Sequence, residues 1–165
     1  MVRVGITGHM DLTPASAELV RAALTEALTP QAQKGLTGVS CIAAGADSIF
    51  ADVALSLGGE LEVILPASDY RARKVKPDHA ELFDALISRA AHVRVMPFEE
   101  SNRAAYEAAN EALLGSVDLL MAVWDGRSPV DRGGTAAVVE SARSRSLRVE
   151  IIWPSGAERL SDVKR

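Results

Sequence analysis

Residues 38–66 read GVSCIAAGADSIFADVALSLGGELEVILP. This stretch holds two short runs, 38–43 and 61–65, whose β-branched and apolar residues predict strands. Between them, residues 47–57 have the small, apolar composition of a packed helix, and Gly58-Gly59 supplies its stop. Parallel strands cannot be joined by a tight turn, and they need a crossover of this kind. The stretch therefore predicts a parallel strand–helix–strand unit, which decides the fold class.

The same alternation continues on both sides of this unit. Thr13-Pro14 predicts a helix start, with a hydroxyl cap followed by proline at the first helical position. Further strands are predicted at 2–7, 92–96, 118–124 and 149–153, and further helices from 14, around 82–90, at 102–115 after a Ser101 cap, and at 133–145. Five helical crossovers between six strands predict an α/β fold, a three-layer, doubly wound, Rossmann-like parallel sheet. We expect a single domain over 1–154 and a polar tail, 155–165, that frays.

Composition narrows the classes of function. The chain has 165 residues, 48% hydrophobic and 24% charged, which is typical of a soluble globular domain. Its single cysteine, Cys41, excludes an internal disulfide framework and a multi-cysteine zinc site. The apolar runs are too short to span a bilayer and the N-terminus has no cleavable signal pattern, so we expect a cytoplasmic protein without a membrane partner. The net charge of −4 argues against nucleic acid as a partner.

Several common cofactor motifs are missing. The first turn, Gly-Ile-Thr-Gly-His at 5–9, departs from G-x-G-x-x-G, and no acidic residue ends the second strand to hold a ribose. These departures argue against a standard nicotinamide-linked dehydrogenase. The sequence has no G-x-x-x-x-G-K-[ST] motif and no H-E-x-x-H motif, which argues against a P-loop NTPase and a hydrolytic zinc site. We therefore expect no metal site.

Small-residue turns are nevertheless present where predicted strands end. They are Thr7-Gly8-His9, the turn 44–47 with Gly45 and Asp47, and Arg132-Gly133-Gly134-Thr135. All three belong to the carboxyl edge of the sheet, where open α/β sheets bind ligands. Glycine lets a ligand reach backbone N–H groups, and the last turn opens a helix whose end adds partial positive charge. The Thr135 hydroxyl could donate to a phosphate oxygen, beside Arg132. The alternative is that glycine only suits the backbone at these turns.

Other polar residues are expected at the same edge. Asp125 follows the apolar strand and could accept from ribose hydroxyls or a base amino group, or it could be a turn residue before glycine. Tyr106 and Asn110, spaced i,i+4, could face one ligand or form a buried polar pair. The basic run 70–76 could clamp a phosphate or be a solvated loop. His9 could contact a phosphate or cap the following helix.

Together these features resemble the Rossmann-like SLOG superfamily, which joins the Smf/DprA DNA-processing proteins to the LOG (cytokinin-activating) phosphoribohydrolases. The resemblance is carried by CIAAGAD at 41–47, ADVAL at 51–55, Gly58-Gly59 and VILP at 63–66. The start of the helix at 133–135 looks like the superfamily's glycine-rich phosphate-binding turn. The resemblance spans Gly5 to Pro154 and implies a pocket for a nucleotide or a nucleotide-derived ligand.

The sequence departs from the LOG pattern at its catalytic positions. The LOG turn G-G-x-G-T-x-x-E has glutamate three residues after threonine, whereas this chain has Val138 there and its first acid at Glu140. Those two positions differ by about 200° around a helix. An Arg–Lys pair on the preceding helix is replaced by Ala109 and Asn110. The leading hypothesis is therefore a sensor or carrier that binds a nucleotide-type ligand, and the sequence identifies no other cofactor.

Alternatives remain at this point. The first is an N-glycosidic hydrolase or transferase acting on a nucleoside monophosphate, for which Asp125 and Glu140 are the candidate catalytic carboxylates. The second is a structural partner domain, in which Gly134 and Thr135 tolerate substitution. Many members of the superfamily pair through helices, and the helix at 102–115 carries alanines on more than one face. We therefore expect a homodimer, the alternative being a helix tightly packed within a monomer.

Overall fold

The computed structural model describes residues 1–127 and 134–163. Its strands are β1 (Val2–Gly8), β2 (Leu36–Ser40), β3 (Glu60–Leu65), β4 (His92–Val95), β5 (Leu119–Val123) and β6 (Arg148–Ile152). Its helices are α1 (Pro14–Gln33), α2 (Ala46–Ser56), α3 (Tyr70–Lys74), α4 (Pro77–Arg89), α5 (Arg103–Leu114), α6 (Gly134–Ser144) and α7 (Leu160–Val163). Strands and helices thus alternate as the sequence predicts.

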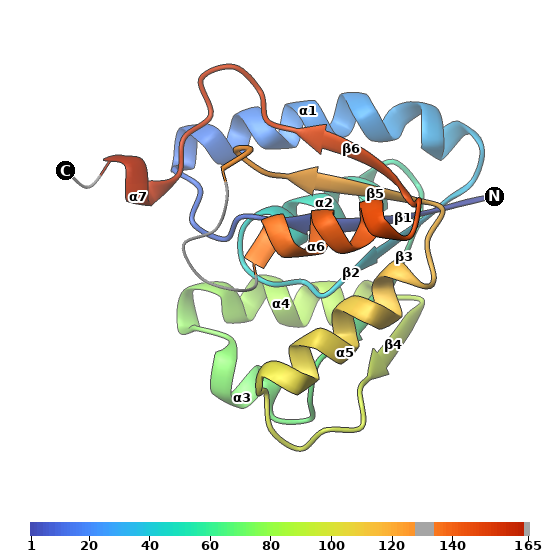
Figure 1. Cartoon of the computed structure of the whole chain (residues 1–165), viewed down its shortest axis with the longest axis vertical. Helices are drawn as coiled ribbons and strands as arrows, with labels where there is room; N and C mark the ends of the chain where they lie inside the picture. The colour runs from blue at the N-terminus through green and yellow to red at the C-terminus, as the bar shows by residue number, and fades with distance from the viewer. Residues whose placement is uncertain (128–133, 164–165) are drawn as a thin grey trace.

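The strands form one parallel sheet in the order β4-β3-β2-β1-β5-β6. Figure 1 shows α5 and α6 crossing one face of this sheet. The apolar side chains of α1, α2 and α4 pack together with strand residues on the opposite face. Two helical layers around a parallel sheet confirm the predicted fold class. Within the described residues, no helix is both long and apolar enough to cross a bilayer.

The longest helix begins and packs as its sequence predicts. The Thr13 hydroxyl accepts the Ser16 N–H at 3.1 Å, and Pro14 occupies the first turn, where its missing N–H leaves no helical bond unmade. Val20, Leu24 and Leu28 are fully buried and line the stripe that faces the sheet. β5 is buried along its whole length, as expected for a central strand covered on both faces.

Two predicted boundaries differ because side chains bond to the backbone. β2 ends at Ser40, three residues before the predicted end, because the Ser40 hydroxyl accepts the Ile42 N–H at 3.0 Å and Ile42 has a φ of 45°. That left-handed conformation cannot continue a strand. The predicted Ser101 cap of α5 is wrong: Asn102 Oδ1 accepts the Ala105 N–H at 2.9 Å, while Ser101 donates to Asp69.

Two segments that the sequence left irregular are structured. Residues 70–74 form α3, although the basic side chains along it are exposed, as a solvated loop would have them. The tail was expected to fray, but its described part returns to the start of α1. The Glu158 N–H donates to Ser16 Oγ at 2.7 Å, and Leu12 and Arg159 form an antiparallel bridge. These contacts join residues more than 140 positions apart, which no local pattern reports.

Candidate functional site

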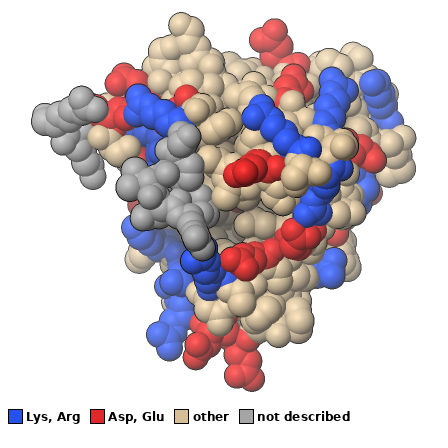
Figure 2. Space-filling model, in the orientation of Figure 1, with Lys and Arg blue, Asp and Glu red and all other residues tan. Residues whose placement is uncertain are grey.

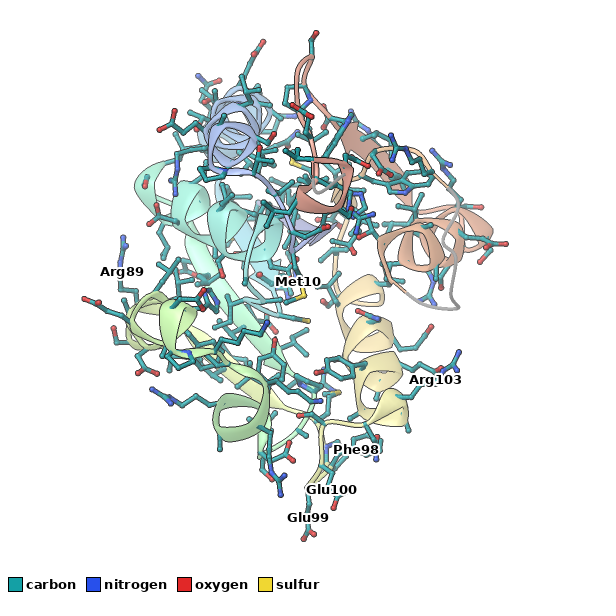
Figure 3. The ribbon with its side chains drawn as sticks, turned by 90° about the vertical axis from the view of Figure 1, so that its left-hand side faces the viewer. Met10, Arg89, Phe98, Glu99, Glu100 and Arg103 are labelled. Carbon is teal, nitrogen blue, oxygen red and sulfur yellow. The ribbon has the colours of Figure 1, made fainter. Side chains whose placement is uncertain are left out.

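The candidate site lies where the strand order of the sheet reverses, between β1 and β5. From β1 the chain adds strands on one side through β4, then crosses back to place β5 against the other side of β1. The carboxyl ends of β1 and β5 are therefore adjacent, and a crevice at such a point is where open α/β sheets bind ligands. Figure 3 views the molecule from its left side in Figure 1, so that this carboxyl edge faces the reader.

His9 and Asp125 meet at this point. The backbone N–H of His9 donates to the Val123 carbonyl at 3.1 Å, which fixes the residue after β1 against the end of β5. His9 Nε2 accepts the Asp125 backbone N–H at 3.1 Å, so the ring hydrogen resides on Nδ1 in the neutral imidazole. Burial and the nearby Arg159 guanidinium lower the pKa of His9, against the opposing effect of Asp125. His9 is therefore a neutral acceptor, held edge-on against the Trp153 ring with centroids 5.6 Å apart.

Asp125 has one satisfied oxygen and one that is not. Oδ1 accepts the Arg127 N–H at 3.0 Å, which is the turn role that the sequence allowed. Oδ2 is buried and has no hydrogen-bond partner in the described chain, and the side chain is only 5% exposed. Two guanidinium groups lie near Oδ2 beyond hydrogen-bond distance, Arg159 at 3.8 Å and Arg127 at 3.9 Å. The carboxylate is thus charge-balanced but keeps an open acceptor.

The C-terminal segment, residues 154–163, brings one of these guanidinium groups to the site. Arg159 Nε donates to Asp11 at 2.8 Å, and the Leu160 N–H donates to the Asp11 carbonyl at 2.6 Å. Asp162 in turn accepts from Arg127 at 2.7 Å. Sequence reasoning missed Arg159, because it lies in a polar tail that carries no motif.

Two of the predicted phosphate-binding glycines have packing roles. A Cβ on Gly8 would lie 2.5 Å from Ala46 Cβ and 2.8 Å from Val123 Cβ, so glycine lets β1, α2 and β5 approach closely. A Cβ on Gly45 would lie within 2.8 Å of the backbone of His9 and Met10, and its φ of 81° favours glycine. These contacts agree with the alternative that glycine suits the backbone. Thr7 lies within β1 and is half-buried.

The start of α6 is described only from Gly134 onward. Arg132 and Gly133 were predicted to bind phosphate and lie outside the described residues. Gly134 has a φ of 72°, and open space surrounds the position that its Cβ would take. Thr135 lies in the first turn of α6 and is only 9% exposed; this helix contacts β1, β5 and β6. Glu140 is exposed on α6.

Asp47 belongs to a second group of polar residues at the same edge. It lies in the first turn of α2, where burial raises the pKa of its carboxyl to about 7, although the Ala43 N–H bonds to it. Its charge opposes ionisation of the Cys41 thiol and of the Tyr70 hydroxyl, whose pKa values are raised mainly by burial. The Tyr70 ring meets the Tyr106 ring of α5 edge to face, with centroids 6.3 Å apart. This group extends the site from β1 and β5 toward β2 and β3.

The pair predicted on α5 is divided between solvent and interior. Tyr106 is 38% exposed, Asn110 is half-buried, and no hydrogen bond joins the two side chains in the described chain. They are therefore not a buried polar pair. The structure brings His9 and Asp125 into contact directly, and it places Asp47 and Tyr106 in the neighbouring group. The prediction missed Tyr70 as a site residue, although its sequence falls at the start of the basic run.

The turn between β2 and α2 is held in an uncommon backbone conformation. Ile42 is fully buried with φ at 45°, which is rare for a β-branched residue. Its carbonyl accepts from Ser48 Oγ at 3.2 Å and lies 3.0 Å from His79 Nε2. These bonds fix the turn that positions Asp47 and Cys41. His79 therefore has a structural role, in agreement with the absence of any functional expectation for it.

Solved structures share this fold, whereas no family model and no curated protein matches the sequence. DNA processing protein A (DprA) from Streptococcus pneumoniae aligns with a TM-score of 0.71 at 21% identity, over 98% of this chain and 54% of that one. Helicobacter pylori DprA, which binds single-stranded DNA, aligns at 0.67 and 16% identity, over 98% of this chain and 70% of that one. The molybdenum cofactor binding protein from Rippkaea orientalis aligns at 0.61 and 15% identity, over 93% and 77%.

These likenesses confirm the fold expected from the resemblance to the SLOG superfamily. The chain spans about half the length of the S. pneumoniae protein. The expectation that nucleic acid is an unlikely partner is wrong, because a protein that binds single-stranded DNA has the same fold. Net charge averages over the whole surface, and it misses local groups of one sign. Figure 2 shows basic side chains over α3, where Arg71, Arg73 and Lys74 are exposed; Arg71 pairs with Asp84 of α4 at 2.7 Å.

Proposed function

We propose that this chain binds a nucleotide or a nucleotide-derived ligand at the carboxyl edge of its sheet, as a sensor or carrier. One observation carries the proposal: Asp125 Oδ2 is a buried acceptor without a hydrogen-bond partner in the described chain. It lies at the point where the strand order of the sheet reverses. Leaving a buried carboxylate oxygen unpaired costs free energy, typically about 1–3 kcal/mol or more for a charged group. A ribose hydroxyl or a base amino group supplies the missing donor.

The phosphate of such a ligand has a place at the start of α6. The first N–H groups of a helix lack partners within it, and the helix end carries partial positive charge. Gly134 leaves open space there, and Thr135 supplies a hydroxyl in the first turn. In this proposal Arg132 and Gly133 complete the cradle, Thr7, Gly8 and Gly45 shape its floor, and Asn110 and Asp47 read the sugar or base.

Titration calorimetry tests the proposal with mononucleotides, NAD, ADP-ribose, cyclic nucleotides and a short single-stranded oligonucleotide. We expect one of these ligands to bind with a Kd below 1 mM. Asp125→Asn replaces one acceptor oxygen with an NH2 group and should weaken binding at least 10-fold, because a donor then faces a donor. Asp52→Asn is the matched control, since Asp52 pairs with Arg21 on the outer face of α2. Absence of any binding at millimolar concentrations overturns the proposal.

The second candidate function is N-glycosidic cleavage of a nucleoside monophosphate. The observation in its favour is the contact of a neutral imidazole with a buried carboxylate: His9 Nε2 lies 3.4 Å from Asp125 Oδ1. A carboxylate beside the anomeric carbon can stabilise oxocarbenium-like charge. Glu140 was the other catalytic candidate, and it is exposed on α6, whereas His9 and Asp125 are buried. Free base released from the same nucleotides, and lost in Asp125→Asn, would favour catalysis over binding alone.

A further inference from the structure

The sheet has two edge strands, β4 and β6, each with one side open. β4 pairs only with β3 and β6 only with β5, and no other described strand or bridge reaches their outer sides. Figure 1 shows the two strands at opposite ends of the sheet. The backbone N–H and C=O groups on the outer side of an edge strand can bind a further strand. Each edge is therefore a candidate surface for a partner.

The side chains of β6 differ between the two faces of the sheet. Arg148 and Glu150 lie on the side of α1, where they line a groove of about 510 Å³ between this helix and β6. Neither forms an ion pair with a described residue. On the other face, Val149 packs against the cluster below α5 and α6, and Ile151 is 39% exposed. Beside its open edge, β6 thus has one charge of each sign on one face and apolar side chains on the other.

This pattern is complementary to a second copy of itself. In an antiparallel pair of identical strands, residues that lie opposite each other share a face, and one residue at the two-fold axis faces its own copy. With Val149 at the axis, Arg148 of each copy lies opposite Glu150 of the other, and Leu147 lies opposite Ile151. An axis at Arg148 or at Glu150 would instead place two like charges opposite each other. Opposite charges across a strand pair stabilise it and like charges destabilise it, so charge favours the register centred on Val149.

The other edge strand lacks this complementarity. His92 and Arg94 share a face of β4, and the strand has no acidic residue. Self-pairing centred on Val93 would place Arg94 opposite His92, and self-pairing centred on Arg94 would place two guanidinium groups opposite each other. Charged side chains of one sign are a common protection of sheet edges against pairing. The comparison therefore selects β6 as the edge that binds a second copy.

We propose that two copies of this chain associate through β6, antiparallel and with Val149 at the two-fold axis, so that their sheets join into one. Two Arg148–Glu150 pairs then cross the interface on the side of the grooves, and Ile151 is covered on the other face. The joined strands run in opposite directions, so the carboxyl edges of the two sheets point away from each other. The interface therefore leaves both candidate sites open, and the inference does not rest on the proposed nucleotide-binding function.

Light scattering tests the association at protein concentrations up to about 1 mM. We expect a particle of twice the 17.5 kDa mass of the chain. Arg148→Glu and Glu150→Arg each turn both cross-strand pairs into like-charge pairs, so each should raise the Kd of the dimer at least about 10-fold. The matched control is Arg103→Glu, which makes the same change of charge on the exposed surface of α5, where Arg103 pairs with Glu107. This variant should keep the wild-type Kd.

Complementation between the two charge variants makes the test independent of folding defects. In an equimolar mixture, the acidic strand of Arg148→Glu lies opposite the basic strand of Glu150→Arg, so both cross-strand pairs again join opposite charges. The mixture should therefore form a dimer with a Kd within about 3-fold of the wild-type value. The double variant Arg148→Glu/Glu150→Arg exchanges the two charges within one chain, and it should regain the dimer by itself. A variant that had lost its fold would give neither result.

Three outcomes would overturn the inference. The first is a wild-type mass of 17.5 kDa at every concentration, which would leave the β6 edge without a second copy. The second is a dimer that both Arg148→Glu and Glu150→Arg leave intact, and its loss in Arg103→Glu would assign the contact to α5. The third is dissociation of both single variants without recovery in either the mixture or the double variant, since charge across β6 would then not set the register.

Discussion

The substitution Asp47→Asn should make the free energy of unfolding less sensitive to pH. Burial raises the pKa of this carboxyl from 3.8 to about 7 in the folded chain. Between these two values the unfolded chain has lost the proton while the folded chain keeps it, so wild-type stability falls as pH rises. The difference corresponds to at most about 4 kcal/mol, reached above pH 7, where the folded chain holds a buried charge. Asparagine has the same size and does not ionise.

Urea unfolding at pH 4.5, 6 and 8, followed by circular dichroism, measures this effect. Relative to wild type, Asp47→Asn should gain stability progressively from pH 4.5 to pH 8. Asp52→Asn should show no such gain, since its carboxylate already pairs with Arg21 at 2.7 Å. If the difference between Asp47→Asn and wild type stays constant to within about 1 kcal/mol over this range, the Asp47 carboxyl is not desolvated and the reasoning is refuted.

Three further predictions concern other residues of the carboxyl edge. Gly45→Ala should destabilise the fold by more than the roughly 1–2 kcal/mol that a positive φ alone costs, because the added Cβ would clash with the His9 and Met10 backbone. The control is Gly58→Ala, which has a φ of 84° and open space around it, so that urea unfolding of this variant measures the cost of the positive φ alone. Arg159→Gln should speed amide hydrogen exchange at 158–163, because the bond to Asp11 is lost; unchanged exchange would show that the bond does not hold the segment. Thr135→Val should weaken ligand binding about 10- to 150-fold in calorimetry while melting temperature falls little; the reverse order would make it a structural residue only.

The fold could be predicted because its signals are local. Each apolar strand, each helix cap and each stop occurs within a few residues of the element it defines, as Thr13-Pro14 does for α1. The boundaries that differ depend on bonds that sequence periodicity does not contain. The Ser40 hydroxyl accepts the Ile42 N–H, and β2 ends early at this point; the Ser101 hydroxyl donates to the distant Asp69, and the next residue, Asn102, caps α5.

The site could be predicted in part, for a related reason. Asp125 was identified from its position after a buried strand, and the topology then placed it beside His9. The lack of a hydrogen-bond partner for Oδ2 could not be predicted, because it depends on the position of the Arg159 guanidinium group, which belongs to the C-terminal segment and stays 3.8 Å away. Gly45 was predicted for a ligand but is needed for the approach of the His9 and Met10 backbone, since the same residue type serves both purposes.

Asp47 and Asp125 together indicate which property of a ligand this edge reads. Asp125 Oδ2 has no hydrogen-bond partner in the described chain, and the Asp47 carboxyl is bonded by the Ala43 backbone, so both groups are suited to donors, whether these belong to a free nucleotide or to the bases and sugars of a single strand. Phosphate contacts distinguish the two, because each phosphate neutralised on a single strand contributes about −0.7 to the slope of log K against log salt. A mononucleotide held by one helix end should give a slope of about −1 or smaller in magnitude, whereas a strand that also contacts the cations of α3 should give a steeper one. Salt dependence, measured on the wild-type chain with GMP and with an oligonucleotide, therefore decides between a small-ligand site and a strand-binding surface, and a flat slope for the oligonucleotide would exclude α3 from its binding.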